Sequence, residues 1–364
     1  MNKRDTIVLP GLGGLVLAGA RPIFAIFLAL IVGAVVIWVA GANPIEAYAA
    51  MLRGSIGTLA ALSNTGVRAI PLLFGGFAVG LGLKAGMQNI GGDGQMYFGG
   101  LAATVVGIIP LPVPAWLHLL LAVLAGFAGG ALGILLPAYF RAYRGVSEVN
   151  TTFMLNYIAA YIVSWLVHKP SPLAAGSFYP MSPPILPSAR LPILVKGTSL
   201  HAGLVLALAI GVALHFVLRY TSFGFRIRMI GGNLEAARYA GVDVARQILL
   251  VLLICGGMAG LGGASMVLGL KLKLFDYFTG GIGYEGLALA IVMNGSPLGI
   301  IAGSVFFGAL KAGAGRMQIS TGIPSSMALV IEALTVLIAL AIGFGERAHV
   351  TRRQKESHAE EDAA

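Results

Sequence analysis

The chain has 364 residues, of which 57% are hydrophobic and only 10% are charged, with 24 Lys and Arg against 14 Asp and Glu. Soluble domains carry about 25% charged residues, so this chain has too few charges to form the polar shell of a soluble protein. The composition, with a mean hydropathy of +0.89, excludes ordinary cytosolic enzymes and nucleic-acid-binding modules despite the net charge of +10. It predicts an all-α polytopic membrane protein.

The chain begins with a basic segment, residues 1–21, which precedes an apolar run over about 22–42. A basic start before an apolar run is also typical of a signal peptide, and Ala40-Gly41-Ala42 resembles a cleavage site. The run is longer than the roughly 7–15 apolar residues of a signal peptide. We therefore predict a cytoplasmic N-terminus followed by an uncleaved first span.

Further apolar stretches bring the expected number to about ten spans, at about 20 residues each. They lie near residues 63–83, 89–109, 113–137, 149–168, 201–219, 247–269, 282–296, 298–315 and 324–344. The stretches at 89–109 and 282–296 are rich in glycine and polar residues, so either is a candidate for a broken or re-entrant helix. With the N-terminus inside, most Lys and Arg face the cytoplasm, and Trp38, Trp116 and Trp165 all fall at the outer face.

Two short segments share the form I-G-x-acid-G. They begin at Ile90 and Ile282, and they place Asp93 and Glu285 at equivalent positions. In the ten-span topology one segment starts a span from the inside and the other from the outside, which predicts an inverted repeat. Inverted repeats are typical of transporters, with the pathway at the repeat interface. The pattern favours a transporter over a membrane enzyme.

The outer segment, residues 169–200, contains a series of prolines from Pro170 to Pro192. Proline fixes φ and removes a backbone donor, so we predict an ordered, non-helical loop or a stiff linker. Its length exceeds that of common loops. Both a simple connection and an external docking surface remain open.

The cytoplasmic loop, residues 220–246, contains a predicted helix of about two turns. Asn233 is a good N-cap, Glu235 suits the first turn, and Gly241 can end the helix. The helix has a face of small residues, Ala236, Ala237 and Ala240. A helix this short is unstable alone. It must therefore pack under the helical bundle or dock against a cytoplasmic protein.

The stretch GFRIRMIGGNLEAARYAGVDV within this loop resembles the coupling segment of ABC-transporter permeases of the branched-chain amino acid, ribose and nucleoside superfamily. Three other stretches resemble nucleoside and simple-sugar permeases of that superfamily: LKAGMQNIGGDGQMYFGGLAA, GVSEVNTTFMLNYIAAY and GYEGLALAIVMNGSPLGIIAGSVFFGALKAGAGRMQ. The resemblance covers roughly residues 45–345 and is nearest to permeases that work with purine-nucleoside lipoproteins. The sequence departs from the usual pattern at Gln88, Asp93 and Leu234.

The resemblance implies a type II ABC importer permease in a bacterial inner membrane, with both termini cytoplasmic. It places the transmembrane domain at 22–345 and a polar, disordered tail at 346–364. The implied partners are an ABC ATPase, a second and different permease subunit, an external substrate-binding protein, and the lipid membrane, with no nucleic acid. The sequence contains no G-x-x-x-x-G-K-[ST] motif, so ATP and Mg are expected on the partner ATPase, and no cofactor is expected on this chain.

The implied ATPase-coupling residues are Phe225, Arg226, Arg228, Gly231, Asn233, Glu235, Ala236, Ala237, Arg238, Tyr239, Ala240 and Gly241. Polar groups within membrane segments are costly and often functional. The candidates for the translocation pathway are Asn89, Asp93, Gln95, Asn150, Asn156, Glu285 and Asn294. The alternative role for each is to cap a broken helix or to bond across helices.

No metal-ligand or catalytic pattern is present, since there is no H-E-x-x-H motif and the histidines are scattered. We therefore predict a transport subunit and not an enzyme. The expected cargo is a nucleoside, in particular a purine nucleoside, with a simple sugar such as ribose or galactose as the alternative. An ion-coupled secondary transporter using Asp93 and Glu285 is a further alternative.

Overall fold

The computed structural model describes residues 12–176 and 179–341, with side chains from residue 24 onward. Residues 1–11 of the predicted N-terminal segment and the predicted tail at 346–364 lie outside this part of the chain. The described residues form helices, with two isolated β-bridges that join Met181 to Phe275 and Ile193 to His201.

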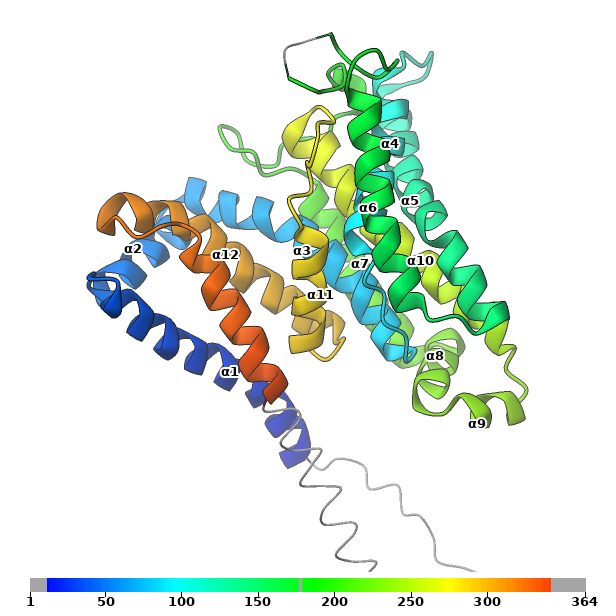
Figure 1. Cartoon of the computed structure of the whole chain (residues 1–364), viewed down its shortest axis with the longest axis horizontal. Helices are drawn as coiled ribbons and strands as arrows, with labels where there is room; N and C mark the ends of the chain where they lie inside the picture. The colour runs from blue at the N-terminus through cyan, green and yellow to red at the C-terminus, as the bar shows by residue number, and fades with distance from the viewer. Residues whose placement is uncertain (1–11, 177–178, 342–364) are drawn as a thin grey trace, which may run out of the picture. The chain divides into compact units, whose positions relative to one another are not determined.

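The helices follow one another along the chain as drawn in Figure 1. In order they are α1 (Leu12–Val39), α2 (Pro44–Ile56), α3 (Leu59–Lys84), α4 (Gly92–Ile108), α5 (Ala115–Tyr139), the π-helical η1 (Phe140–Arg144), α6 (Glu148–Val167), the 3-10 turn η2 (Pro187–Ala189), α7 (Gly203–Tyr220), α8 (Ser222–Gly232), α9 (Leu234–Tyr239), α10 (Val244–Ser265), the π-helical η3 (Met266–Lys271), α11 (Ile282–Val292) and α12 (Pro297–Thr321), and then a helix over Met327–Ala341.

Each predicted span overlaps a helix, but fewer helices than predicted can cross a membrane on their own. Among the described residues, five helical segments are long and apolar enough: α3, α5 with η1, α7, α10 with η3, and α12. A sixth span would be α1 with α2, which are bent by 118° relative to each other. The 11 residues of α11 reach only about 16 Å, half the thickness of a hydrocarbon core. The count of ten spans therefore remains a proposal.

The chain forms two compact units, residues 1–49 with 317–364, and residues 50–316. In the first unit, α1 packs against the helix over Met327–Ala341. A Cβ added at Gly33 would lie 3.1 Å from Cγ1 of Ile331, and the Tyr48 hydroxyl donates a 2.7 Å hydrogen bond to the carbonyl of Leu30. Glycine at position 33 thus allows the two helices to approach closely.

The core of the second unit is α10, which packs against α3, α4 and α5. Gly126 and Gly130 on α5 face Gly256 and Gly260 on α10, and each pair is four residues apart. A Cβ added at Gly260 would lie 2.8 Å from Cα of Gly130, closer than real Cβ contacts allow. Small residues at this spacing let membrane helices pack backbone to backbone.

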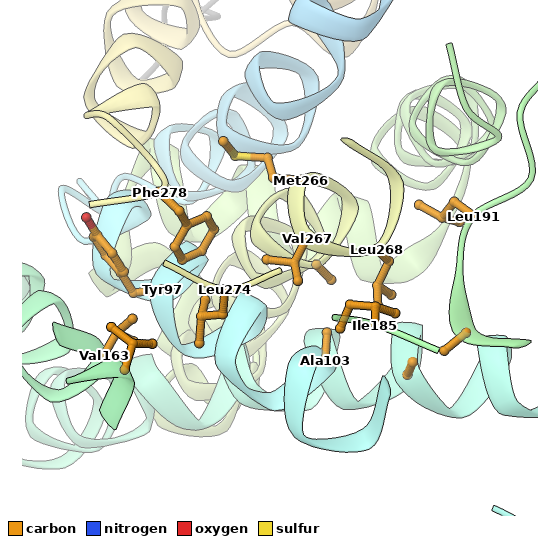
Figure 2. Packing of buried hydrophobic residues seen from close by; sticks show 14 of the residues in the cluster. Tyr97, Ala103, Val163, Ile185, Leu191, Met266, Val267, Leu268, Leu274 and Phe278 are labelled. Atoms are coloured by element: carbon orange, nitrogen blue, oxygen red, sulfur yellow. The ribbon is translucent and has the colours of Figure 1, made fainter. Parts of the chain in front are cut away.

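The outer segment is held on the second unit and does not extend away from it. The backbone N–H of Ser182 donates a 2.8 Å hydrogen bond to the carbonyl of Leu274, in the connection between η3 and α11. The backbone N–H of Leu191 donates a 3.0 Å hydrogen bond to the carbonyl of Leu268, in η3. Figure 2 shows Ile185 and Leu191 of this segment in one apolar cluster with Leu268. The predicted ordered, non-helical loop is therefore present as a packed cover.

The two ends of the second unit differ in composition. Within this unit, Figure 1 places the outer segment at one end and α8 with α9 at the other. Trp116 begins α5 and Trp165 lies near the end of α6, so both lie toward the outer segment. The opposite end carries many of the arginines: Arg141, Arg144, Arg219, Arg226, Arg228, Arg238 and Arg246. An uneven distribution of arginines between the two ends is typical of membrane proteins.

Candidate functional site

The first turns of α4 and α11 meet inside the second unit, where a buried carboxylate joins them. Asp93 accepts a hydrogen bond from the backbone N–H of Gly283 at 3.1 Å and another from the Thr279 hydroxyl at 3.1 Å. Both helices direct the positive ends of their dipoles toward this point, and a carboxylate there offsets them. The two segments of the predicted repeat are thus in direct contact.

A pair of amides, Asn89 before α4 and Gln95 within it, flanks Asp93. Asn89 donates to Oε1 of Gln95 at 2.8 Å, and Gln95 donates back to Oδ1 of Asn89 at 2.8 Å. Oδ1 of Asn89 also accepts from the N–H of Gly91 at 3.0 Å. Both side chains are buried. Their mutual bonds fix the turn that leads into α4.

Asn156 connects α6 to the same junction. Its Oδ1 accepts from the N–H of Gly94 at 2.8 Å, and its Nδ2 donates to the carbonyl of Ile90 at 3.0 Å and to the Tyr284 hydroxyl at 2.9 Å. A Cβ added at Gly94 would lie 2.8 Å from Cα of Asn156, so only glycine permits this approach. We call Asn89, Asp93, Gln95 and Asn156 the polar junction.

The structure therefore brings together four of the seven predicted pathway residues, and their polar atoms bond within the protein. The polar junction holds α4, α6 and α11 in register, which corresponds to the alternative role considered from the sequence. Glu285 lies in the same first turn of α11 and forms an ion pair with Lys311. Asn150 and Asn294 are exposed and lie outside the junction.

Glu148 is a positioning residue that the sequence did not single out. The buried carboxylate accepts from the N–H of Gln88 at 2.9 Å and lies 3.0 Å from Nε of Arg141. It thereby fixes the start of α6 to the turn before the polar junction. An acidic residue beside an apolar span, in the stretch GVSEVN, was the signal that could have identified it.

A cavity of about 490 Å³ opens beside the first half of α3, η3 and the connection to α11. Its lining includes the aromatic residues Phe275, Tyr277 and Phe278 and the cations Arg68, Lys271 and Lys311. Burial lowers the pKa of His201, which precedes α7 and lines the same cavity, to about 4. This histidine is therefore neutral near pH 7, and the lining combines aromatic surfaces with hydrogen-bond donors. The sequence did not predict the cavity, because its lining comes from distant segments.

The exposed face of α6 carries aromatic side chains at every fourth position. We call Phe153, Tyr157, Tyr161 and Trp165 the aromatic face. Residues four apart lie one above another on a helix, and the rings of Phe153 and Tyr157 meet edge to face at 5.4 Å. Tyr157 is 54% exposed and Tyr161 is 67% exposed.

The exposed face of α5 has a different pattern. Its exposed middle positions are leucines, apart from Ala128: Leu120, Leu121, Leu124, Leu132, Leu135 and Leu136. Trp116 stands at one end, and Tyr139 and Tyr143 stand at the other, as in the aromatic belts of lipid-facing helices. On α6, by contrast, tyrosine hydroxyls lie near the middle of the helix, where hydrocarbon would leave them without hydrogen-bond partners. The aromatic face of α6 therefore suits a passage or a protein partner better than lipid.

The predicted coupling helix is present as α9, and its start is capped as expected. Oδ1 of Asn233 accepts from the N–H of Glu235 at 3.0 Å and from that of Ala236 at 3.1 Å. Gly241 follows the helix with a φ of +78°, a conformation that favours glycine. The preceding helix α8 contributes exposed Phe225, as well as Arg226, Arg228 and Gly231.

One predicted coupling residue lies elsewhere than expected. Ala237 is 0% exposed and belongs to the interior, so it does not share an exposed small-residue face with Ala236 and Ala240. The reason is that α9 is a six-residue helix and uses Ala237 to pack against its own subunit. The most exposed large side chain of α9 is instead Tyr239, at 91%. Glu235 and Arg238, 3.7 Å apart, are exposed beside it.

The comparisons with known proteins agree with this arrangement. A family model described as branched-chain amino acid transport system / permease component matches residues 61–340. The chain belongs to this permease family. Membership implies an ATPase and a binding protein as partners, and it makes this permease a transport subunit and not an enzyme. It also removes the ion-coupled alternative.

Relatives of this permease are named for glucose, for nucleosides and for riboflavin. It is 33% identical to a glucose ABC transporter permease protein of Haloferax volcanii, over 92% of this chain and 90% of the relative. It is 32% identical to a guanosine ABC transporter permease protein of Bacillus subtilis, over 87% and 91%. It is 28% identical to a nucleoside ABC transporter permease protein of Lactococcus lactis, over 89% and 90%. In B. subtilis and L. lactis a second permease protein of the same description also matches.

Proposed function

We propose that this permease carries nucleosides, in particular purine nucleosides, from an external binding protein through the membrane. The observation that carries this proposal is the aromatic face of α6. Stacking of a base on an aromatic side chain contributes about 1–3 kcal/mol and tolerates different bases. A purine nucleoside offers a flat base for such rings and hydroxyls for the tyrosines, and it carries no charge that the membrane would oppose.

The passage would form where two permease subunits meet, with the aromatic face of α6 on its wall. The 490 Å³ cavity beside α3 and η3 lies within the usual range for small-molecule sites and would receive cargo near the outer end. The polar junction would keep α6 in place beside it. Asn150, Glu285 and Asn294 remain candidates for the wall.

The remaining architecture is proposed on the same basis. The transmembrane domain would span residues 22–345 in about ten crossings, with an inverted repeat around Ile90 and Ile282. The arginines near α8 and α9 support a cytoplasmic position for that end and for both termini, in a bacterial inner membrane.

The ATPase, with its ATP and Mg, would dock on α8 and α9, and the binding protein would dock on the outer segment. The paired relatives in B. subtilis and L. lactis support a second, different permease subunit.

The test is uptake of labelled guanosine by cells that contain the whole transporter. Tyr157→Ala and Tyr161→Ala should each lower uptake about tenfold at low guanosine, because a base stack contributes about 1–3 kcal/mol and a tenfold change corresponds to about 1.4 kcal/mol. The matched controls are Leu124→Ala and Leu132→Ala on the exposed face of α5, which should change uptake less than twofold at equal expression. Tyr157→Phe and Tyr161→Phe should retain uptake, since they keep the ring.

Two outcomes would count against the proposal. If the α5 variants lose uptake as strongly as the α6 variants, the aromatic face is not specific to the passage. If labelled glucose is taken up and guanosine does not compete, the cargo is a simple sugar. That alternative is supported by the similarity to the glucose permease protein of H. volcanii.

A further inference from the structure

A second cavity, of about 570 Å³, lies at the other end of the second unit, beside the coupling segment. It is enclosed by α8, by the turn from Ala240 to Asp243 that follows α9, and by the first two turns of α10. The side chains that matter are Arg226 on α8 and Arg246, Gln247 and Leu250 on α10. The proposed nucleoside passage does not use this cavity, although Arg226, Ala240 and Gly241 of its lining belong to the segment on which the ATPase would dock.

Gln247 provides the first evidence that something binds there. Its side chain is only 5% exposed, and its Nε2 has no hydrogen-bond partner among the described residues. Leaving a buried amide donor unpaired costs about 1–3 kcal/mol, and such groups are uncommon in folded proteins. Gln247 also lines the cavity, so a ligand with an acceptor oxygen bound there would give this donor a partner.

The charges of the cavity identify the ligand as an anion. Arg226 and Arg246 supply two guanidinium groups, and the only acid of the lining is Asp243. The Asp243 carboxylate already accepts a 3.0 Å hydrogen bond from the N–H of Arg246 as the N-cap of α10. The lining therefore carries one net positive charge and three groups that donate hydrogen bonds. Guanidinium groups match the oxygens of a phosphate in geometry as well as charge.

The position of the cavity indicates that the phosphate belongs to a lipid. The segment from Val244 to Lys271 is long and apolar enough to span a membrane, so Arg246 and Gln247, in its first turn, lie at the level of lipid headgroups. Leu250 continues the lining one turn deeper and is exposed. A polar end at the interface and an apolar end toward the hydrocarbon suit an amphiphile, as in basic pockets that hold anionic headgroups between helices.

We propose that this cavity binds the phosphate of an anionic phospholipid headgroup between Arg226, Arg246 and Nε2 of Gln247, with an acyl chain along Leu250. The bound headgroup would hold the Ala240–Asp243 turn against α10. Because this turn follows α9, the lipid would also fix the orientation of the coupling segment.

The test uses the full chain, purified in detergent and delipidated, with binding of phosphatidylglycerol followed by native mass spectrometry. Replacing both Arg226→Gln and Arg246→Gln should weaken binding at least tenfold. Gln247→Leu should weaken it several-fold, since it removes one charge-assisted bond. The matched control replaces Arg228→Gln and Arg238→Gln, which removes the same charge from exposed positions outside the cavity and should change binding less than twofold.

Thermal unfolding separates lipid binding from misfolding. Without lipid, Gln247→Leu should be at least as stable as the unmodified chain, because the unpaired donor is gone. Added phosphatidylglycerol should raise the melting temperature of the unmodified chain but not that of the variant.

Three results would overturn the proposal. The first is equal loss of binding in the Arg228/Arg238 control, which would indicate attraction to the whole basic surface. The second is equal binding of phosphatidylcholine, which would indicate apolar retention. The third is displacement of the lipid by inorganic phosphate with the same stabilisation, which would assign the cavity to free phosphate.

Discussion

At the scale of single residues, Asp93 shows how one carboxylate can define a membrane fold. It belongs to the first turn of α4, yet its partners are Thr279 and Gly283, at the start of α11. A buried carboxylate that lies at the start of one helix and accepts two hydrogen bonds near the start of another stabilises both helix ends. These bonds give Asp93 a part in positioning the two helices.

Asp93→Ala should destabilise the permease more strongly than substitutions of other polar membrane residues. It leaves the Gly283 N–H and the Thr279 hydroxyl without their acceptor, at a cost of about 1–3 kcal/mol for each buried donor. Asp93→Asn keeps one acceptor oxygen and should lose less. The measurement is the midpoint of thermal unfolding in detergent. Asn150→Ala, at an exposed position of α6, is the control and should stay within about 0.5 kcal/mol. Equal stability of Asp93→Ala and Asn150→Ala would contradict the positioning role.

At the scale of elements, close packing of α5 on α10 depends on glycine. Gly260→Val should reduce the amount of folded permease in the membrane, because its side chain would overlap the backbone at Gly126 and Gly130. The control is Gly315→Ala on α12, where an added Cβ meets no described atom of another element within 4 Å. This control should be neutral or slightly stabilising, since alanine is the better helix former. Fluorescence-detected size exclusion would measure both, and a normal monodisperse peak for Gly260→Val would refute the packing argument.

The coupling segment gives a second prediction at this scale. Tyr239→Ala should lower co-purification of the ATPase at least fivefold while membrane insertion stays intact, because Tyr239 is the most exposed large side chain of α9 and exposed tyrosines often dominate interfaces. Tyr143→Ala is the matched control, since Tyr143 is an exposed tyrosine at the same end of the unit but outside the segment. Unchanged co-purification of Tyr239→Ala would argue against docking on α9. Ala237→Asp is less informative, because it places a charge in the interior.

The sequence predicts elements better than it predicts contacts. Apolar runs located the helices, and cap residues located α9, because both signals are local. The burial of Ala237 was not predictable, since a two-turn helix with alanines on several sides does not reveal which side faces its own subunit. The four residues of the polar junction were among seven pathway candidates, and bonding across helices was the alternative role. Their partners could not be predicted, because the bonds of Asp93 and Asn156 reach segments more than 60 residues away. The aromatic face required knowing which side of α6 the rest of the chain covers.

At the scale of the whole molecule, orientation can be tested with the chain's own chemistry. The single cysteine, Cys255, is fully buried and should not react with a maleimide. Labelling of a variant therefore measures the exposure of the introduced cysteine. Lys196→Cys on the outer segment should react with a membrane-impermeant maleimide in spheroplasts. Glu235→Cys on α9 should react only after the membrane is opened. The unmodified chain should remain unlabelled in both conditions, and the reverse pattern would invert the proposed topology.

The bond between Asp93 and Gly283 also constrains the order of biogenesis. The two residues are 190 positions apart, and translation at about 5–20 residues per second implies a delay of roughly 10–40 s between them. During that interval α4 has reached the membrane, but α11 has not yet been made. The Asp93 carboxylate therefore lacks the donor that offsets the free-energy cost of burying it. The nascent permease must therefore shelter this carboxylate in the insertion machinery or in a water-filled crevice until α11 arrives. A chain interrupted before α11 would leave Asp93 without the Gly283 N–H that it accepts from in the folded permease.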